Sequence, residues 1–277
     1  MSPPSSTSYS LFLLLSLSIF KFNCQASAAD HFSSLCPSRR CGNINITYPF
    51  WLITESTSTQ YCGYRSFGFN CSADDVLLFH LPGGSYHVTN IDYEQHKLAL
   101  VDIDVTTDLT CPRPRHNLPL EPLPALSYSN LDLNLSFYFN CSNTPNYSGY
   151  VIGCLGFESK SSYVFVEGRE PKGIDWSKTC EQKVVTAVMS GEIDENHPTG
   201  GFGRALNAGF TLDWQGVAEG RSCEAHGGRY GYNNTETLLC FCPDGTVSTK
   251  PCKTKDRSKL RLKLRKGKIY TRHHMFC

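Results

Sequence analysis

The sequence predicts a mostly β, disulfide-rich extracellular protein of two modules, an N-terminal β-meander domain and a C-terminal β domain that ends in a small stapled unit. Three observations support this class. The chain of 277 residues contains 14 Cys, a leader-like apolar run lies near its N-terminus, and short segments rich in β-branched and aromatic residues alternate with Gly and Pro turns. The apolar fraction of 40% is enough to bury a core in one or two domains, which excludes a disordered polymer.

The N-terminal segment has the features of a secretory leader. Residues 11–20 read LFLLLSLSIF, and the small residues Ala26 and Ala28 follow at the spacing that signal peptidase accepts. We interpret residues 1–28 as a cleaved signal peptide. The run is too short to span a membrane, which needs about 20 apolar residues. Because no second run of spanning length follows, the mature chain is expected to be secreted, with no membrane-spanning segment.

The segment 76–104 predicts a β-meander. Three apolar-biased stretches are cut by a Pro-Gly-Gly turn and by a polar cluster, which gives strand, turn, strand, turn, strand. The two-residue strand period places Tyr86 and Val88 on one face and His87 and Thr89 on the other.

A proline-rich segment marks the predicted domain boundary. Residues 112–124 contain five prolines, which remove backbone donors and fix φ, so they predict an extended connector. The predicted organisation is a signal peptide at 1–28, an N-terminal domain at 29–118, a connector at 119–132, a C-terminal module at 133–252 and a basic tail at 253–277.

The C-terminal module begins with further strand-like segments. Residues 133–141, 162–168 and 183–190 are rich in β-branched and aromatic residues and predict strands. Residues 204–207 predict a short helix that Gly209 ends.

The amino-acid composition changes over residues 214–252, which contain Gly turns and a Cys-x-Cys pair. It is typical of a small disulfide-stapled module that cannot build a large core of its own, and it resembles part of an epidermal-growth-factor-like unit. Phe210 and Trp214 would share one face of the preceding strand, where we expect both to pack in the core.

The cysteine count predicts six disulfides. Removing Cys24 with the leader leaves 13 cysteines, and Cys277 stands apart in the tail. No CxxC pair, HExxH motif or zinc-finger spacing occurs, so we expect no metal site and no cofactor. The spacing does not give the connectivity. The twelve cysteines expected to pair are Cys36, Cys41, Cys62, Cys71, Cys111, Cys141, Cys154, Cys180, Cys223, Cys240, Cys242 and Cys252.

Six N-x-S/T sequons support secretion and predict glycosylation. Asn70 and Asn140 are each followed by a cysteine, which makes them less accessible than the others. The six sites are Asn45, Asn70, Asn134, Asn140, Asn146 and Asn233.

Charge is divided unevenly along the chain. Residues 250–277 contain 11 Lys/Arg and one Asp, whereas the chain between the leader and this segment contains 14 Lys/Arg and 24 Asp/Glu. An acidic body argues against a nucleic-acid partner, because neutralising phosphates needs a basic face on the folded domain. The tail, in which Lys/Arg alternate with Leu, is interpreted as a disordered segment or the product of an alternative transcript end, or as a segment that adheres to acidic polymers or membrane surfaces.

Several motifs resemble one plant receptor family. Residues 36–71, with CPSRRCGNINITYPFWL and YCGYRSFGFNCS, resemble the galacturonan-binding extracellular domain of wall-associated receptor kinases. LLFHLPGGSYHVTNIDYEQHKLALVD and CPRPRHNL are most similar to the leaf-rust-resistance branch of receptor-like kinases. FTLDWQGV, GGRYGYNN and LLCFCPDG resemble the wall-associated-kinase C-terminal module, so the likeness covers residues 36–252.

The resemblance implies a receptor-ectodomain-like protein that binds acidic cell-wall polysaccharide, or pectin, in cell-wall sensing or defence. Family members continue into a transmembrane helix and a serine/threonine kinase, but the Gly-rich loop, HRD and DFG motifs are absent here, and residues 200–204 lack the third Gly of GxGxxG. We therefore expect no intrinsic catalysis. Alternatives stay open. The chain could be a soluble decoy or co-receptor, a truncated copy of a plasma-membrane single-pass kinase, or an ectodomain whose partner is a peptide or another receptor kinase.

One departure from the family concerns a disulfide. The family usually has cysteines at the positions that here are Tyr230 and roughly Gly220, so the resemblance implies one missing bridge between them.

Binding a polygalacturonate needs cations for carboxylates and flat rings for sugar faces. The cationic candidates are Arg39, Arg40, Arg113 and Arg115, with His116 beside them, and their alternative role is ordinary solvated charge. The stacking candidates are Tyr48, Trp51 and Tyr64, with Phe50 between them, and their alternative role is core packing. The chain contains no EF-hand-like sequence that would support binding of the polymer through calcium bridges. Catalytic residues are not expected, because no GxSxG occurs and Ser85 has no identified partner.

Overall fold

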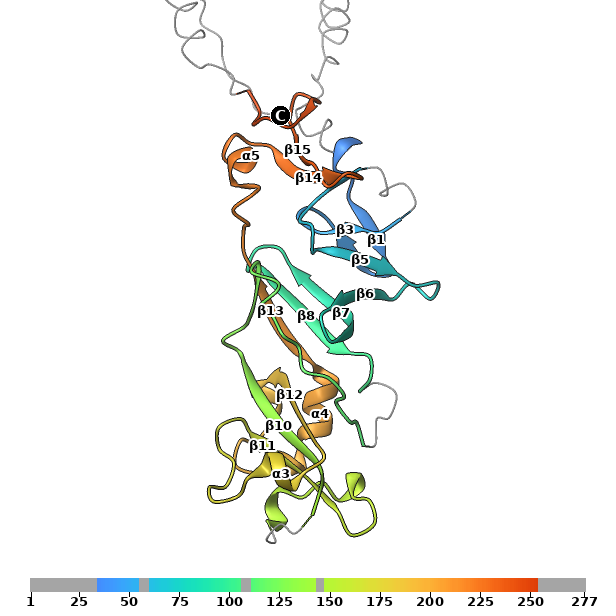
Figure 1. Ribbon diagram of the computed structural model, residues 1–277. Helices are drawn as coiled ribbons and strands as arrows, with labels where there is room; N and C mark the ends of the chain where they lie inside the picture. Colours follow the sequence, from blue (N-terminus) through green and yellow to red (C-terminus); the bar gives the residue numbers. More distant parts are fainter. Residues whose placement is uncertain (1–33, 55–59, 106–110, 143–146, 254–277) are drawn as a thin grey trace, which may run out of the picture.

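The computed structural model describes residues 34–54, 60–105, 111–142 and 147–253. The fold is mostly β, as predicted, and the molecule is elongated, with its sheets arranged one after another along the long axis (Figure 1). Within these ranges no helix has the length and apolar character needed to cross a bilayer. The predicted signal peptide, Cys24, Asn146, Cys277 and all but the first residue of the basic tail lie outside the described residues.

The middle of the molecule is a seven-stranded sheet that contains the predicted meander. Its strands, in spatial order, are β3 (Trp51–Leu52), β5 (Gly68–Cys71), β6 (Leu77–Leu81), β7 (Gly84–Asp92), β8 (Lys97–Asp102), β13 (Phe210–Trp214) and β9 (Leu126–Tyr128). β3 and β5 are parallel, and the other pairs are antiparallel. The strand β13 comes from the C-terminal half of the chain yet lies between two strands of the N-terminal half.

The predicted faces of the meander are confirmed. Tyr86 and Val88 are buried, whereas Thr89 is exposed and His87 is half-buried. Alternation of this kind is what one buried face and one solvated face of a sheet produce.

Phe210 and Trp214 are also buried, as expected for core residues. The Trp214 ring packs edge-on against Phe50, with 4.8 Å between the ring centroids. Phe50 stacks between Phe67 and Phe69 at 4.9 Å from each. This aromatic column fills the core between the central sheet and the N-terminal end of the described chain.

The proline-rich segment contains no helix or strand from Pro112 to Pro119, and it then leads into β9. Its polar groups bond to other segments: Asn117 Oδ1 accepts from Val185 N of β12 at 2.8 Å, and the Leu118 carbonyl accepts from the Tyr128 hydroxyl of β9 at 2.7 Å. The predicted domain boundaries stay a prediction.

The lower end of the molecule in Figure 1 is a three-stranded antiparallel sheet in the order β11-β10-β12, in which the three predicted strands are found. α4 packs on one face of this sheet and ends at Gly209, whose φ is +81°. A Cβ there would lie 2.0 Å from the Leu100 carbonyl oxygen, so only Gly fits. The elements of this end are β10 (Asp132–Cys141), η2 (Ser148–Tyr150), η3 (Gly153–Leu155), β11 (Ser161–Val166), α3 (Trp176–Thr179), β12 (Gln182–Met189), η4 (Ser190–Glu192), η5 (Pro198–Gly200) and α4 (Phe202–Ala208).

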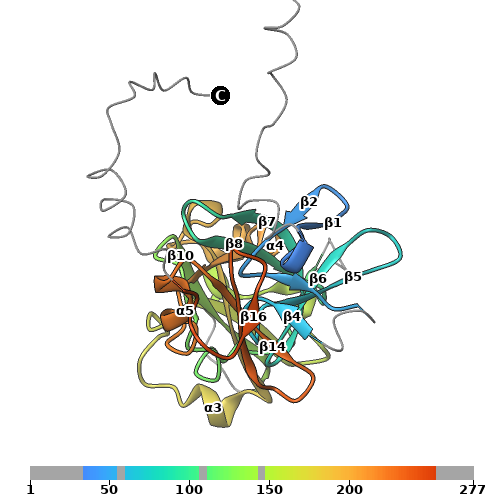
Figure 2. The ribbon, with the colours of Figure 1, turned by 90° about the horizontal axis from the view of Figure 1, so that it is seen from above.

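The stapled unit, residues 214–252, forms the opposite end together with one strand from the N-terminal half of the chain. Its four-stranded sheet has the order β16-β15-β14-β4, and β4 pairs antiparallel with β14 through Cys62 and Gly231 (Figure 2). The elements here are β1 (Arg39–Cys41) and β2 (Ile44–Ile46), which form a hairpin, then β4 (Gln60–Cys62), α5 (Arg221–Ala225), β14 (Arg229–Asn233), β15 (Leu238–Phe241) and β16 (Val247–Ser248).

The twelve predicted cysteines form six disulfides, as expected. Each links segments separated by 10 to 43 residues, so each closes a loop within one end of the molecule. The pairs are Cys36–Cys62, Cys41–Cys71, Cys111–Cys154, Cys141–Cys180, Cys223–Cys240 and Cys242–Cys252.

The two positions of the implied missing bridge are neighbours. A Cβ on Gly220 would lie 1.9 Å from the ring of Tyr230, which is 1% exposed. The tyrosine ring therefore occupies the space above the glycine Cα, where the resemblance implies a bridge in relatives.

Candidate functional site

The candidate binding site is a cavity of about 230 Å3 between the first hairpin, β3 and β4. Four of its lining side chains are of types that suit a sugar acid: the cation Arg39, the rings of Trp51 and Tyr61, and the amide of Gln60. The other lining residues are Leu35, Cys36, Pro37, Ile46, Tyr48, Phe50, Leu52, Thr54 and Cys62. Among these described lining residues none is Asp or Glu, and Arg39 is the only one with a charged side chain.

Disulfides and short strands hold these side chains in place. Arg39 begins β1 and is exposed, and the same hairpin is tied down by Cys41–Cys71. Cys36–Cys62 joins the segment before β1 to β4, which carries Tyr61. Strands of two or three residues cannot position side chains alone, so the crosslinks fix the walls of the cavity.

Trp51 and Tyr61 form a stacked pair at the cavity wall. Their ring centroids are 3.8 Å apart and the planes differ by 16°. The Trp51 indole Nε1 donates to the Tyr64 carbonyl oxygen at 2.9 Å, which fixes the orientation of the ring. Both rings are half-buried, so part of the pair remains accessible to a ligand.

Tyr48 and Tyr64 act mainly as structural residues. Both hydroxyls donate to Oε1 of Glu224, at 3.1 Å from Tyr64. Burial, and then the bond and charge of Glu224, raise the pKa of the Tyr48 hydroxyl far above its usual range, and burial followed by the Glu224 charge raises the pKa of Tyr64. The Arg229 guanidinium lies 5.5 Å from the centre of the Tyr48 ring. Tyr48 lines the cavity with its ring, whereas Tyr64 is only 5% exposed.

Behind Tyr48 lies a second hollow, which we call the aromatic cleft. It measures about 360 Å3 and is lined by Thr47, Tyr48, Pro49, Tyr64, Tyr93, His96, Trp214 and Gly216. These residues come from the segment between β2 and β5, the turn between β7 and β8, and the end of β13 with the chain just after it. The cleft thus lies where the central sheet meets the stapled end of the molecule.

The remaining predicted cations lie elsewhere. Arg40 follows Arg39 in β1, so it points to the opposite side of that strand. The Arg113 guanidinium lies 4.2 Å from the centre of the Phe139 ring, and it donates to Gln182 Oε1 at 3.0 Å.

Arg115 and His116 line a separate open groove of about 680 Å3, which also contains Lys183, Glu121 and Glu167. His116 Nδ1 lies 3.2 Å from Asp104 Oδ2. The groove therefore presents both signs of charge.

Of the predicted residues, the structure brings Arg39, Tyr48 and Trp51 together in the cavity. Sequence reasoning missed Tyr61 and Glu224. The signal for Tyr61 is its position next to the bridged Cys62, whereas Glu224 lies 176 residues from Tyr48 and has no local signal.

Two other arrangements bear on chemistry. Ser85, which has no partner apparent in the sequence, lies 2.6 Å from His80 Nδ1 across the β6–β7 hairpin. Neither residue lines the three hollows described above. The sulfurs of Cys223, Cys240 and Cys252 lie within 4.8 Å of one another, but all three are in disulfides and so offer no thiolate to a metal.

Comparisons with known proteins agree with these features. Residues 36–102 match the family model described as wall-associated receptor kinase galacturonan-binding, and residues 140–245 match the model described as wall-associated receptor kinase C-terminal. The cavity thus lies mostly within the first match, and neither model is a kinase domain.

One curated relative is the leaf rust 10 disease-resistance locus receptor-like protein kinase-like 2.3 of Arabidopsis thaliana. It is 27% identical over 143 residues, which are 50% of this chain and 22% of the relative. The chain therefore spans about a fifth of the length of that relative. No solved structure matches the chain.

Proposed function

We propose that the chain, which matches the family models for the galacturonan-binding and C-terminal regions of wall-associated receptor kinases, binds acidic cell-wall polysaccharide, or pectin. In this proposal it is a receptor-ectodomain-like protein without intrinsic catalysis. One observation supports this most strongly. The cavity in the galacturonan-binding domain combines the exposed cation Arg39 with the Trp51–Tyr61 stack, and its described lining contains no acidic side chain.

The proposed binding mode follows from the chemistry of the lining. A galacturonate residue has one carboxylate and a pyranose ring with an apolar face of C–H groups. The Arg39 guanidinium can donate two parallel hydrogen bonds to the carboxylate, and the exposed part of the aromatic pair can lie against the ring. The volume of about 230 Å3 limits this contact to one or two sugar units, so a longer polymer would continue outside the cavity.

We further propose that the protein is secreted and works in the cell wall. Six disulfides support an oxidising compartment, and residues 1–28 supply the signal peptide. Among the proposed glycosylation sites, Asn45 is exposed on β2. The amides of Asn134 and Asn140 instead donate to Glu167 and Glu181, which makes these two sites less accessible in the folded protein.

A peptide or receptor partner is the second candidate function, and the groove around Arg115 favours it. A surface that presents Arg115 and Lys183 beside Glu121 and Glu167 suits a chain of mixed charge better than a polyanion. If the chain is one part of a longer receptor, as its coverage of the relative allows, both sites would face outward from a single-pass kinase in the plasma membrane.

The test is retention of the folded protein on de-esterified pectin across a salt titration. We expect retention at low salt and its loss at high salt, because the contact is between charges. Arg39→Ala should weaken retention several-fold, and Arg40→Ala, one residue along the same strand on its opposite side, should have little effect. Arg113→Ala and Arg115→Ala test the other cations. No retention at low salt would reject polysaccharide binding, and a loss confined to Arg115→Ala would place the site in the groove.

A further inference from the structure

The aromatic cleft offers a carboxylate beside ring faces. Both tyrosines of its wall, Tyr48 and Tyr64, bond to Oε1 of Glu224. Gly216, which also lines the cleft, would bring a Cβ to 3.9 Å from Glu224 Oε2. The second carboxylate oxygen therefore lies next to the cleft rather than inside the core.

The Glu224 charge beside the cleft has a described cation near it, Arg229, whose guanidinium lies 5.5 Å from the centre of the Tyr48 ring and does not line the cleft. None of the described lining residues is Lys or Arg, and His96 is the only base among them. The Lys97 ammonium nearby is already paired with Asp213 at 2.7 Å. Aromatic faces next to a carboxylate form a site that complements a cation with apolar neighbours.

The basic segment at the end of the same chain supplies cations with apolar neighbours. Residues 254–277 contain nine Lys/Arg and one Asp, and in the run KLRLKLRKGK (259–268) cations alternate with leucines. The rest of the mature chain is strongly acidic, so the two parts attract each other.

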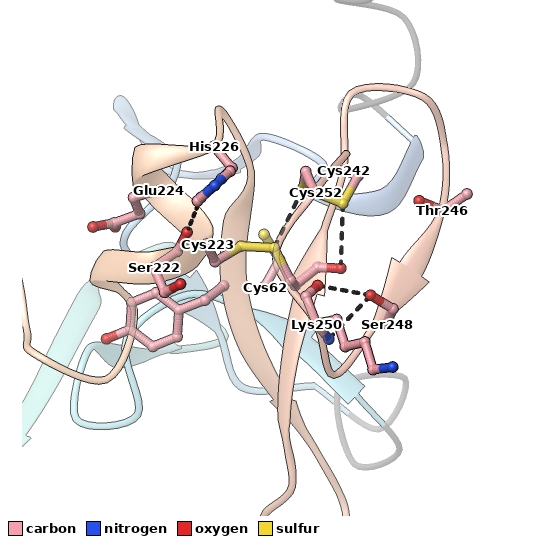
Figure 3. The surroundings of a disulfide bond; sticks show 12 residues. Cys62, Ser222, Cys223, Glu224, His226, Cys242, Thr246, Ser248, Lys250 and Cys252 are labelled. Carbon is pink, nitrogen blue, oxygen red and sulfur yellow. Dashed lines mark hydrogen bonds between the residues drawn. A yellow bond between two sulfur atoms is a disulfide. The ribbon is translucent and has the colours of Figure 1, made fainter. Parts of the chain in front are cut away.

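The described chain ends close to the cleft. The Sγ atoms of Cys252 and Cys223 lie within 4.8 Å of each other, and Glu224 follows Cys223 in α5 (Figure 3). The Cα atoms of Cys252 and Cys223 are thus within about 10 Å, and five extended residues span about 16 Å. The segment after Lys253 is therefore long enough to reach Glu224 with residues to spare.

We propose that the basic segment 254–268 docks on the aromatic cleft of its own chain, where a Lys or Arg side chain pairs with Glu224 and a neighbouring Leu packs on the rings. The docking is intramolecular because the segment is tethered a few residues from its site, which gives a high effective concentration. This inference does not rest on the proposed polysaccharide binding.

Zero-length carbodiimide cross-linking of the full-length chain tests the docking, because this reagent joins a lysine amine only to a carboxylate in contact with it. At low salt we expect amide bonds between lysines of 254–268 and Glu224 in the monomer. Glu224→Gln should abolish them, and it keeps an acceptor for the Tyr48 and Tyr64 hydroxyls, so the fold is retained. Glu219→Gln, an exposed acid in the same connection, is the matched control and should leave these bonds in place.

Trypsin cleavage of the segment provides a second measurement. An exposed ion pair contributes up to about 1 kcal/mol, so Glu224→Gln should speed cleavage by about two- to fivefold at low salt. The docking is overturned if cross-links spread over many acids without enrichment at Glu224, or if Glu224→Gln changes neither the cross-linking nor the cleavage rate. It is also overturned if the cross-links occur only in dimers, because the cleft would then bind the segment of a second copy.

Discussion

The Tyr48 hydroxyl donates to the carboxylate of Glu224, 176 residues further along the chain. This contact joins the segment between β2 and β3 to α5 of the stapled unit, and the β4–β14 pairing runs beside it. The wall of the proposed binding cavity is therefore held from both ends of the described sequence.

Glu224→Ala should destabilise the protein by about 1–3 kcal/mol, because it leaves two largely buried tyrosine hydroxyls without their acceptor. Glu224→Gln should cost less, since its amide oxygen can still accept. Urea unfolding of the two variants measures the difference. Equal stability of Glu224→Ala and the parent protein would mean that the contact does not stabilise the fold.

Asp132 should make stability depend on pH. Burial raises its pKa from 3.8 to about 6, with Oδ2 accepting from Thr211 N and Oδ1 buried without a described partner. A raised pKa means that the folded state holds the proton more tightly than the unfolded state, so this contribution is full below pH 4 and is lost as the pH rises to about 6.

Asp132→Asn should remove that dependence. The free energy of unfolding between pH 4 and pH 7 should fall less in the variant than in the parent, by about 1–2 kcal/mol after allowance for solvent screening. The same slope in both proteins would show that Asp132 titrates normally.

Reduction should unfold the protein, because its short strands depend on crosslinks that contribute roughly 2–4 kcal/mol each. Thermal melts with and without a strong reductant measure this effect. An unchanged melting temperature in fully reduced protein, with thiols counted by alkylation, would contradict it.

A seventh disulfide should be possible where Tyr230 covers Gly220. Gly220→Cys alone should destabilise the protein, because its Cβ would lie 1.9 Å from the ring. Together with Tyr230→Cys the ring is removed, and we expect a bridge that closes a ten-residue loop and recovers about 2–4 kcal/mol. Mass spectrometry shows whether the bond forms, and two free thiols in the oxidised double variant would count against this geometry.

Local patterns predicted the local structure well. The meander from Leu77 to Asp102, the strand that ends at Cys141 and the helix stop at Gly209 each depend on neighbours in sequence, so period and turn chemistry were sufficient.

Pairings between distant segments could not be read from the sequence. β4 has three residues and pairs with β14 about 170 residues away, and nothing in Gln60–Cys62 specifies that partner. The insertion of β13 between β8 and β9 and the disulfide connectivity depend on the same long-range packing.

The residues of the candidate site likewise divide into those that the sequence indicates and those that only long-range contacts reveal. Arg39, Tyr48 and Trp51 were found because cation and ring chemistry is visible in the residues themselves. Tyr61 became a site residue only through its stacking on Trp51, and the role of Glu224 appears only when the two ends of the chain meet.

Titration of a short de-esterified oligogalacturonide into the folded, full-length protein, followed by calorimetry, tests polysaccharide binding at the Arg39 cavity most directly. We expect saturable binding that weakens with salt and falls at least about tenfold in Arg39→Ala, which corresponds to the loss of one charge-assisted contact of about 1.4 kcal/mol. No binding at low salt, or equal affinity in Arg39→Ala, would contradict the account.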